Sequence, residues 1–320
     1  MILVTGATGF VGRHLVQALL DEGLPVRCLL TDYAARKQLP WDVDAPNAPE
    51  LVTGSLLDEE LVFRAVSGVH TIFHFENAFW WGRLRQLERV EVAATRSLIR
   101  AARSARVGRI ITLSHLGATP SSAYNLHRIK GQVEELIRNS GVAYTIIRSG
   151  IVFGPDDAFI NHIAMMMRAN PILFVMPGMG EIVLHPIHIG DLVRALLLCM
   201  ESIDSIDRTL EIGGQEYVTF EDLIYTVMRV TGMKRIVLRL PPYLMRWITS
   251  IYSRILPRSL MTPQWFDILA TNRSAKLGNT YEYFGFQPRR FEDTLASYLP
   301  RRRHLRNLIR YTFRRRPRGF

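Results

Sequence analysis

The three glycines behind the first apolar segment have the spacing of a phosphate-binding turn. Ile2–Val4 predicts a short buried strand, and the string T-G-A-T-G-F-V-G follows it directly, from Thr5 to Gly12. Gly6, Gly9 and Gly12 permit a tight turn, a close backbone approach to a pyrophosphate, and close packing of the helix that comes next. Because a helix N-terminus attracts anions, the chemistry that this spacing favours is the binding of a dinucleotide.

The elements around these glycines form one βαβ unit. Apolar residues recur at helical spacing from Val11 to Leu20, Gly23 ends the helix, and Leu24–Leu30 predicts the next strand. A strand, a glycine turn and a helix within about 30 residues are the context that makes a glycine pattern informative.

The end of the second predicted strand leaves the choice of dinucleotide open. Asp32 follows Gly12 by 20 residues, and on a ribose hydroxyl it would favour NAD. Arg36 or Lys37 turned toward a 2′-phosphate would instead favour NADP. The sequence therefore predicts NAD or NADP as the cofactor.

Strands and helices alternate along the chain with short connections. This alternation predicts a doubly wound parallel sheet, a Rossmann-like α/β fold, with a smaller C-terminal substrate lobe and a basic tail. We expect a dinucleotide-binding domain over residues 1–154, the rest of the sheet interleaved with the lobe over 155–300, and a tail over 301–320. The predicted strands of the first domain are 2–4, 24–30, 50–54, 71–75, 109–114 and 144–148.

The positive charge of the chain is concentrated at its end. Residues 301–320 carry nine arginines and no acid, and subtracting them from the net charge of +11 leaves +2 for the other 300 residues. The body resembles no sequence-specific nucleic-acid module. The tail predicts contact with an anionic membrane surface or an acidic partner, the alternative being a disordered solubilising segment.

Composition predicts a globular cytoplasmic protein. The chain is 48% hydrophobic but has no run of 18 apolar residues, and its first strand begins at residue 2, so no membrane span or leader is expected. Cys28 and Cys199 are far apart and are expected to be buried thiols. Through its tail the protein would be peripheral on the inner face of a membrane.

Residues 242–258 predict an amphipathic helix. One face carries Leu244, Trp247, Ile248 and Ile251, and the other is polar. This apolar face either packs on the lobe or faces a membrane or substrate tunnel.

Several further motifs identify a family resemblance. They are the strings 54–58 (G-S-L-L-D), 71–74 (T-I-F-H), 113–118 (L-S-H-L-G-A), 148–154 (R-S-G-I-V-F-G) and 284–288 (F-G-F-Q-P). With the glycine turn they resemble the atypical and extended short-chain dehydrogenase/reductases of the NAD-dependent epimerase/dehydratase superfamily. That group includes the nucleotide-binding accessory subunit of respiratory complex I.

The resemblance implies a set of cofactor contacts. They are Gly6, Thr8, Gly9, Phe10, Val11, Gly12, Asp32, Arg36, Ser55, Leu56, His74, Lys130 and Ile151. Three positions depart from the family pattern: Ser55 replaces an aspartate, Glu91 an asparagine and Ser149 a proline.

The resemblance also implies a Tyr-x-x-x-Lys pair, which this chain lacks. Lys130 fits the lysine position, but Leu126 stands four residues before it and cannot transfer a proton. Tyr124 would substitute only if its stretch is not helical, and Ser114 and His115 are the other candidates for contact with a substrate oxygen.

Two classes of function follow. The chain is an NAD(P)-binding oxidoreductase or epimerase with weakened or altered catalysis on an unknown small molecule, or a catalytically degenerate nucleotide-binding protein with a structural or sensing role on a membrane or protein complex. No metal site is expected, since His185 and His188 lack a third ligand at metal spacing. Asp156 and Asp157 are expected at the start of a helix. Glu134 and Glu135 are expected on a solvated helix face.

Overall fold

The chain forms two compact units. The computed structural model describes residues 1–30, 39, 41–42, 45–76, 84–255, 259–270, 272, 274–301 and 304–312. The first unit contains Met1–Arg148 and Ile189–Glu211, and the second contains Ser149–His188 and the described residues from Ile212 onward.

A seven-stranded sheet forms the centre of the first unit. Its strands lie in the order β11-β6-β5-β4-β1-β2-β3, and β1 pairs in parallel with both β2 and β4. The pairs β2–β3 and β4–β5 are parallel as well. The strands are β1 (Ile2–Thr5), β2 (Val26–Leu30), β3 (Glu50–Thr53), β4 (Thr71–His74), β5 (Arg109–His115), β6 (Tyr144–Ser149) and β11 (Arg208–Ile212).

This strand order is that of a doubly wound nucleotide-binding sheet. The chain moves outward from β1 through β2 to β3, then returns to the other side of β1 with β4. The direction reverses between β1 and β4, and ligands of such sheets bind outside the carboxyl ends of the strands at that point. The predicted fold class is therefore confirmed.

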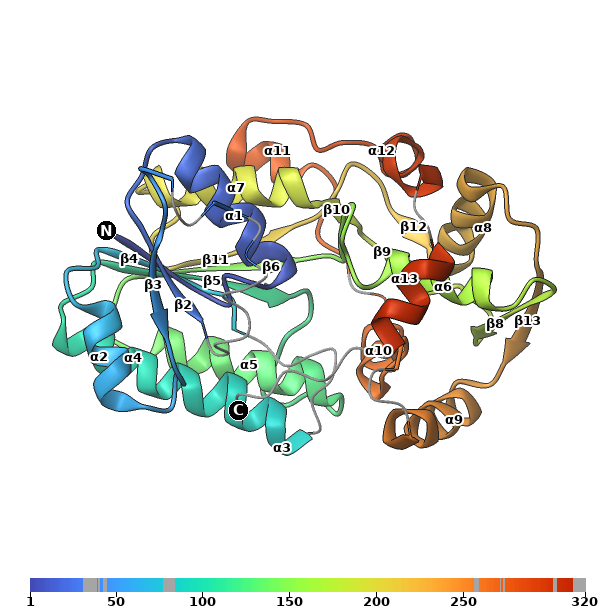
Figure 1. Ribbon diagram of the computed structural model, residues 1–320, viewed down its shortest axis with the longest axis horizontal. Helices are drawn as coiled ribbons and strands as arrows, with labels where there is room; N and C mark the ends of the chain where they lie inside the picture. The colour runs from blue at the N-terminus through green and yellow to red at the C-terminus, as the bar shows by residue number, and fades with distance from the viewer. Residues whose placement is uncertain are drawn as a thin grey trace. The chain divides into compact units, whose positions relative to one another are not determined.

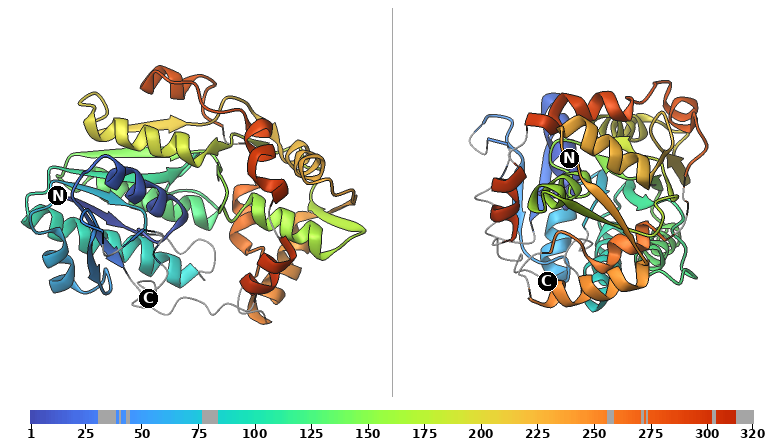
Figure 2. Two further views of the ribbon diagram at one scale, coloured as in Figure 1. Left: turned by 45° about the horizontal axis from the view of Figure 1, so that its top comes forward. Right: turned by 90° about the vertical axis from the view of Figure 1, so that its right-hand side faces the viewer.

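Helices cover both faces of this sheet (Figures 1 and 2). On one face lie α1 (Phe10–Asp21) and α7 (Ile189–Glu201), and on the other α2 (Glu59–Val66), α4 (Ala94–Ser104) and α5 (Asn125–Arg138). Strand residues such as Leu3, Ile72 and Ile110 are fully buried between the layers. Runs of apolar β-branched and leucine residues form these strands because both faces of the sheet are covered.

A π-helix precedes α4. It runs from Glu88 to Ala93 and follows the short α3 (Leu84–Leu87). Single π turns inside α-helices are frequent at functional sites. Here the π turn buries Val90 and Glu91.

The second unit has three two-stranded pairings and seven helices among its described residues. The parallel pairs are β7 (Val152–Phe153) with β10 (Ile187–His188) and β8 (Leu173–Pro177) with β13 (Ile236–Leu240), and the antiparallel pair is β9 (Val183–Leu184) with β12 (Val218–Thr219). The helices are α6 (Ile160–Ala169), α8 (Phe220–Thr231), α9 (Pro242–Ile255), α10 (Pro263–Ile268), α11 (Asn279–Phe284), α12 (Phe291–Tyr298) and α13 (His304–Thr312), with a 3-10 turn at Leu299–Arg301.

Aromatic stacking holds the core of the second unit. The rings of Phe159 and Trp265 stack with centroids 4.4 Å apart, and Phe220 lies 6.3 Å from Phe159. All three side chains are buried, so α6, α8 and α10 are joined by one cluster.

Both cysteines are buried and free, as expected. Burial raises the pKa of Cys28 and of Cys199 to about 12, so both stay protonated thiols at neutral pH. Among the described helices, none combines the length and apolar character that a membrane span requires.

The amphipathic helix predicted over 242–258 is α9, but its packing differs from the interpretation in which the apolar face lies on the lobe. The buried residues of its first two turns are Met245 and Thr249, whereas Leu244, Trp247 and Ile251 are exposed. The apolar face of the sequence pattern is thus the outer face of this helix.

Candidate dinucleotide site

Two of the three glycines are required by the fold itself. Gly6 has a φ of +66°, and a Cβ there would lie 2.6 Å from the carbonyl carbon and oxygen of Phe75 at the end of β4. A Cβ at Gly12 would lie 2.2 Å from the carbonyl oxygen of Gly6. These contacts leave no room for a side chain, so the turn can close only with glycine at both positions.

Gly9 is constrained less by the protein. A Cβ there would meet only the carbonyl oxygen of Gly6, at 3.0 Å, and Gly9 is exposed. It is the N-cap of α1, without a side-chain cap, and its own carbonyl accepts the Arg13 backbone N–H at 3.1 Å. The first backbone N–H groups of α1, from Phe10 and Val11, have no acceptor within the helix. A bare Gly9 therefore leaves these donors accessible to an anion.

Arg13 adds a positive charge to this first turn. Its guanidinium lies 5.7 Å from the ring centroid of Phe10. A cation at a helix N-terminus opposes the helix dipole, and an anion bound there would offset this cost. The sequence analysis did not select Arg13, although its place directly after Gly12 is a visible signal.

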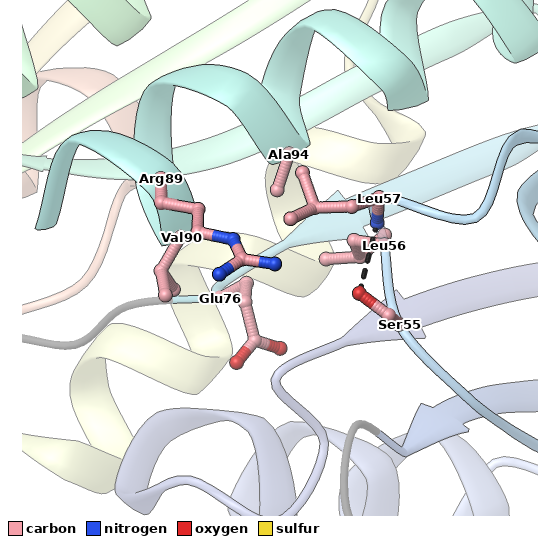
Figure 3. A pocket seen from close by; sticks show the side chains of 7 residues that line it. All are labelled: Ser55, Leu56, Leu57, Glu76, Arg89, Val90 and Ala94. Carbon is pink, nitrogen blue, oxygen red and sulfur yellow. Dashed lines mark hydrogen bonds between the residues drawn. The ribbon is translucent and has the colours of Figure 1, made fainter. Parts of the chain in front are cut away.

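A small pocket lies beside the glycine turn, at the carboxyl ends of β3 and β4 (Figure 3). Its lining residues are Ser55, Leu56, Leu57, Glu76, Arg89, Val90 and Ala94. The Ser55 hydroxyl accepts the backbone N–H of Leu57 at 3.1 Å, which fixes the loop after β3. Mostly apolar walls with a few polar groups are typical of the pocket for a flat ring system.

Glu76 is the buried acid of this pocket. Burial raises the pKa of its carboxyl group to about 7, and the nearby Glu91 carboxylate raises it as well. The backbone N–H of Gly6 and the Lys130 ammonium act in the opposite direction. Its carboxyl group is thus half ionised near neutral pH, directly at the turn that carries the first glycine. The sequence analysis missed Glu76 because a single acid after a strand has no distinctive spacing.

His74 links three elements inside the first unit. Its Nδ1 lies 2.7 Å from the Thr5 hydroxyl, and its Nε2 lies 2.9 Å from the Thr95 hydroxyl. Because the Thr95 hydroxyl donates to the Glu91 carbonyl, His74 must donate from Nε2 and accept at Nδ1. Burial, with the Lys130 charge, lowers the pKa of His74 to about 3, so the ring is neutral.

Lys130 is held in a buried ion pair. Its Nζ lies 2.6 Å from Oε2 of Glu91, which the π turn carries. The other carboxylate oxygen of Glu91 is buried and has no hydrogen-bond partner among the described residues. The lysine that the sequence identified therefore has an acid partner where the family pattern has an amide.

No tyrosine stands on the face of α5 that carries Lys130. Leu126 lies one turn before Lys130 and is only 1% exposed. Tyr124 is the N-cap of the helix, with φ −90° and ψ 125°, and its ring lies 6.5 Å from that of His127. Tyr124 is therefore outside the helix.

Ser114 and His115 lie at the end of β5. The Ser114 hydroxyl is buried and has no hydrogen-bond partner among the described residues. Burial, with the charges of Lys130 and His127, lowers the pKa of His115 to about 3. His115 is thus a neutral imidazole at pH 7 and holds no imidazolium proton to donate. The sequence analysis missed His127, whose spacing of three from Lys130 was its only signal.

Three further predicted residues belong to other parts of the chain than the first unit's described residues. Asp32 and Arg36 lie outside the described residues. Ile151 belongs to the second unit, where its carbonyl accepts the Ile187 N–H at 2.9 Å. In the part of the chain that the structure describes, no group of acids, histidines and cysteines could hold a metal ion.

Glu134 is not on a solvated helix face, so that prediction is wrong. Its side chain is buried and accepts from Arg148 through both carboxylate oxygens, at 2.9 and 2.7 Å, and from Arg138 at 2.6 Å. Its neighbour Glu135 is exposed, as expected. The ion pair between Glu134 and Arg148 joins α5 to β6 within the first unit.

Comparison with known proteins agrees with this geometry. A family model described as NAD(P)H-binding matches residues 6–162. The mouse mitochondrial NADH dehydrogenase [ubiquinone] 1 alpha subcomplex subunit 9 is 26% identical over 262 residues, which cover 78% of this chain and 66% of that protein. This chain thus spans slightly less than two thirds of the length of that relative.

Two further proteins are similar over more of their length. The ceramide reductase of Caulobacter vibrioides is 26% identical over 75% of this chain and 74% of its own. The Escherichia coli quinone oxidoreductase QOR2, solved with NADPH, has a TM-score of 0.73 and 17% identity over 93% of this chain and 99% of that chain. At this identity the last comparison supports the fold. Glycine turn, strand order and family match agree: residues 6–162 of the chain belong to the NAD(P)H-binding family that this model describes.

Proposed function

We propose that the first unit holds NAD(P) with its pyrophosphate at the N-terminus of α1 and its adenine in the pocket between β3 and the π-helix. The exposed backbone at Gly9, which a Cβ would fill, and the Arg13 charge support the first placement. The apolar lining around Ser55 and Leu56 supports the second. Asp32, Arg36, His74 and Ile151 stay predictions from the sequence as further contacts.

The polar cluster beyond this pocket would meet the nicotinamide half. Lys130, the free oxygen of Glu91 and the Ser114 hydroxyl are the groups available to ribose or substrate oxygens. When bound, NAD(P) supplies the hydride acceptor or donor. These side chains would hold and orient the cofactor and the substrate. None of the described side chains takes the place of a tyrosine beside Lys130 as a proton donor.

The function that this site supports best is dinucleotide binding without tyrosine-dependent reductase chemistry, in a structural or sensing role. The observation that carries it is the buried Leu126 in the position from which a proton would be donated. The mouse relative is named as a subunit of an NADH dehydrogenase, and a subunit role suits a chain with this substitution.

A reductase or epimerase is the second candidate. The buried Ser114 hydroxyl, which has no hydrogen-bond partner among the described residues, is the observation that favours it. The Caulobacter relative is named as a reductase. In this case Ser114, His115 or Tyr124 would contact the substrate oxygen.

Hydride transfer by the purified protein separates these candidates. We expect no oxidation of NADH or NADPH above the buffer rate with a panel of aldehydes, ketones and quinones, followed by nicotinamide absorbance. Since general acids contribute about 10²–10⁴-fold, Leu126→Tyr is expected to raise any residual rate while the hydroxyl-free control Leu126→Phe does not. Robust wild-type turnover that Ser114→Ala abolishes would establish the second candidate instead.

Binding of NADH is expected to weaken as pH rises above about 7. The pyrophosphate brings negative charge to a site where the Glu76 carboxyl titrates near 7, so binding favours its protonated form. Affinity should be greatest at pH 6 and fall by up to about tenfold per pH unit above 7, as one linked proton allows. Glu76→Gln should be nearly independent of pH between 6 and 9.

Isothermal titration at several pH values measures this dependence. NADH is the probe because it lacks the titrating 2′-phosphate of NADPH. The exposed Glu60 of α2 provides the matched control, since Glu60→Gln should keep the wild-type slope. An equal slope in Glu76→Gln and wild type would exclude Glu76 as the linked group.

We also propose that residues 301–320 are a basic arm for an anionic membrane surface. The described part of this arm, α13, exposes Leu305 and Ile309 one turn apart. Each arginine near an anionic bilayer contributes about 1 kcal/mol to the free energy of membrane binding. Nine arginines therefore make a substantial electrostatic contribution to this binding. Nucleic acid would bind the same charge without sequence preference.

A further inference from the structure

Helix α9 exposes an apolar face that the second unit does not cover. Tyr243 is 76% exposed and Trp247 64%, and Ile251 follows at the same four-residue interval with 38%. Leu244, beside them, is also exposed. Residues four apart share one side of a helix, so these side chains form a continuous strip.

The opposite side of α9 is attached to its own unit. Met245 and Thr249 are buried there, and the guanidinium of Arg246 lies 2.8 Å from Oδ1 of the buried Asp267 on α10. This ion pair and the buried residues fix the rotation of α9 about its axis. The exposed strip is therefore the result of specific packing, and α9 lies at the periphery of the second unit (Figure 1).

The segment that contains β13 and α9 is basic, and two of its arginines pair with acids from outside it, Arg239 with Glu221 and Arg246 with Asp267. Residues 232–266 contain six lysines and arginines and no acid. Just before α9, strand β13 exposes Ile236 and Leu238 as well. A surface that combines aromatic and aliphatic side chains with an excess of cations is complementary to an anionic lipid headgroup layer.

Aromatic residues suit this location particularly well. Trp and Tyr combine an apolar ring with one polar group, and they gather where hydrocarbon meets water. Single exposed apolar residues need no explanation, but a contiguous strip on a helix without a covering partner marks an interaction site.

The described helix of the C-terminal arm, α13, packs within the second unit as well. The Tyr311 hydroxyl of α13 donates to the carbonyl of Ser259 at 3.5 Å, four residues beyond α9. Tyr311 also packs edge-on against His162 of α6, at 4.5 Å between centroids. Two acid-free helices with exposed apolar residues, α9 and α13, thus belong to the same unit.

We propose that α9 is an interfacial membrane contact that places Tyr243, Trp247 and Ile251 among the lipids of an anionic bilayer. This contact is independent of dinucleotide binding and adds an apolar component to the electrostatic attraction of the arm. It predicts that the protein stays bound at a salt concentration that screens its arginines.

Co-sedimentation with vesicles tests this contact on the full chain. Vesicles of phosphatidylcholine with phosphatidylserine are compared with phosphatidylcholine alone over a salt series. Wild type should prefer the anionic vesicles, and Tyr243→Ser combined with Trp247→Ser should lower the partition coefficient by about tenfold or more, also at high salt. Tyr281→Ser, which alters an exposed aromatic residue of α11, is the matched control and should change nothing.

Two further measurements distinguish the electrostatic contribution of the arm from the apolar contribution of α9. Replacing Arg314, Arg315, Arg316 and Arg318 by glutamine should reduce binding at low salt only. Brominated lipids should quench a fluorescence component that is present in wild type and missing in Trp247→Phe, a variant expected to keep its affinity.

Several results would overturn the proposal. One is equal partitioning of the double serine variant and wild type, and another is the absence of lipid binding. A third is a wild-type dimer in sedimentation velocity that the double variant converts to monomer, because the strip would then bind a second copy of this chain. The proposal would also be overturned if wild type bound nucleic acid more tightly than vesicles and the double serine variant lost this binding to nucleic acid.

Discussion

Replacing Gly9 by valine is expected to abolish binding of NADH and NADPH by the otherwise intact protein. The loss should be at least about 100-fold in affinity, or about 3 kcal/mol. In the protein, a Cβ at Gly9 meets only one carbonyl oxygen, at 3.0 Å, so the fold tolerates the change far better than it would at Gly6 or Gly12. The branched side chain instead occupies the space in front of the first N–H groups of α1, where the pyrophosphate must approach.

Thermal shift and isothermal titration with both nucleotides measure this effect. The control is Gln17→Val, which introduces the same side chain at an exposed position of the same helix. Gln17→Val should bind both nucleotides with the affinity of wild type. The affinity of Gly9→Ala should lie between those of wild type and Gly9→Val. Unchanged affinity in Gly9→Val, or no response of the wild type to either nucleotide, would remove the glycine turn as the binding site.

The second large effect concerns stability. Replacing Glu134 by alanine should cost about 3–5 kcal/mol, because it leaves the half-buried Arg148 guanidinium without its main counter-charge. Glu134 is 1% exposed and accepts from Arg148 at 2.9 and 2.7 Å. The hydrogen bonds and charge of Glu134 raise the pKa of Arg148 in the wild type. In the variant the guanidinium still keeps its proton, because arginine is always charged in proteins, so it cannot escape the penalty by deprotonation.

Urea unfolding gives the free energy that this prediction requires. Glu135→Ala, one position along the same helix, is the matched control, since Glu135 is exposed and its removal should change the free energy of unfolding by less than about 0.5 kcal/mol. If the two variants unfolded at the same urea concentration, the buried ion pair would have no net role in stability.

The sequence was sufficient to predict the first unit because its elements are signalled locally. Glycine at positions 6, 9 and 12 can be interpreted without knowing what surrounds it, and buried strands such as 2–5 and 26–30 are mostly apolar. Strand β11 was not predicted, because charged and polar residues alternate with its two buried apolar ones, Leu210 and Ile212. A half-exposed edge strand carries little apolar signal.

The errors at the site and on α9 have a different cause. Which side of α9 is buried depends on the Arg246–Asp267 pair, and no periodicity within α9 reveals a partner 21 residues away. Glu134 and Glu135 are equivalent in sequence and opposite in environment. The buried position of Glu76 follows from the place of β4 beside β1, so it could be known only after the strand order.

Because of the π turn before α4, the shape of part of the pocket depends on the number of residues in this turn. The backbone N–H of Ala94 bonds the carbonyl of Arg89, five residues earlier, and both residues line the pocket. In an α-helix, residues five apart point about 140° away from each other. The wider turn brings them to one side, and it exists because the segment holds one residue more than an α-helical turn would. Loss of any one residue between Arg89 and Ala94 would thus alter the pocket as strongly as replacing one of its walls, whichever side chain was lost.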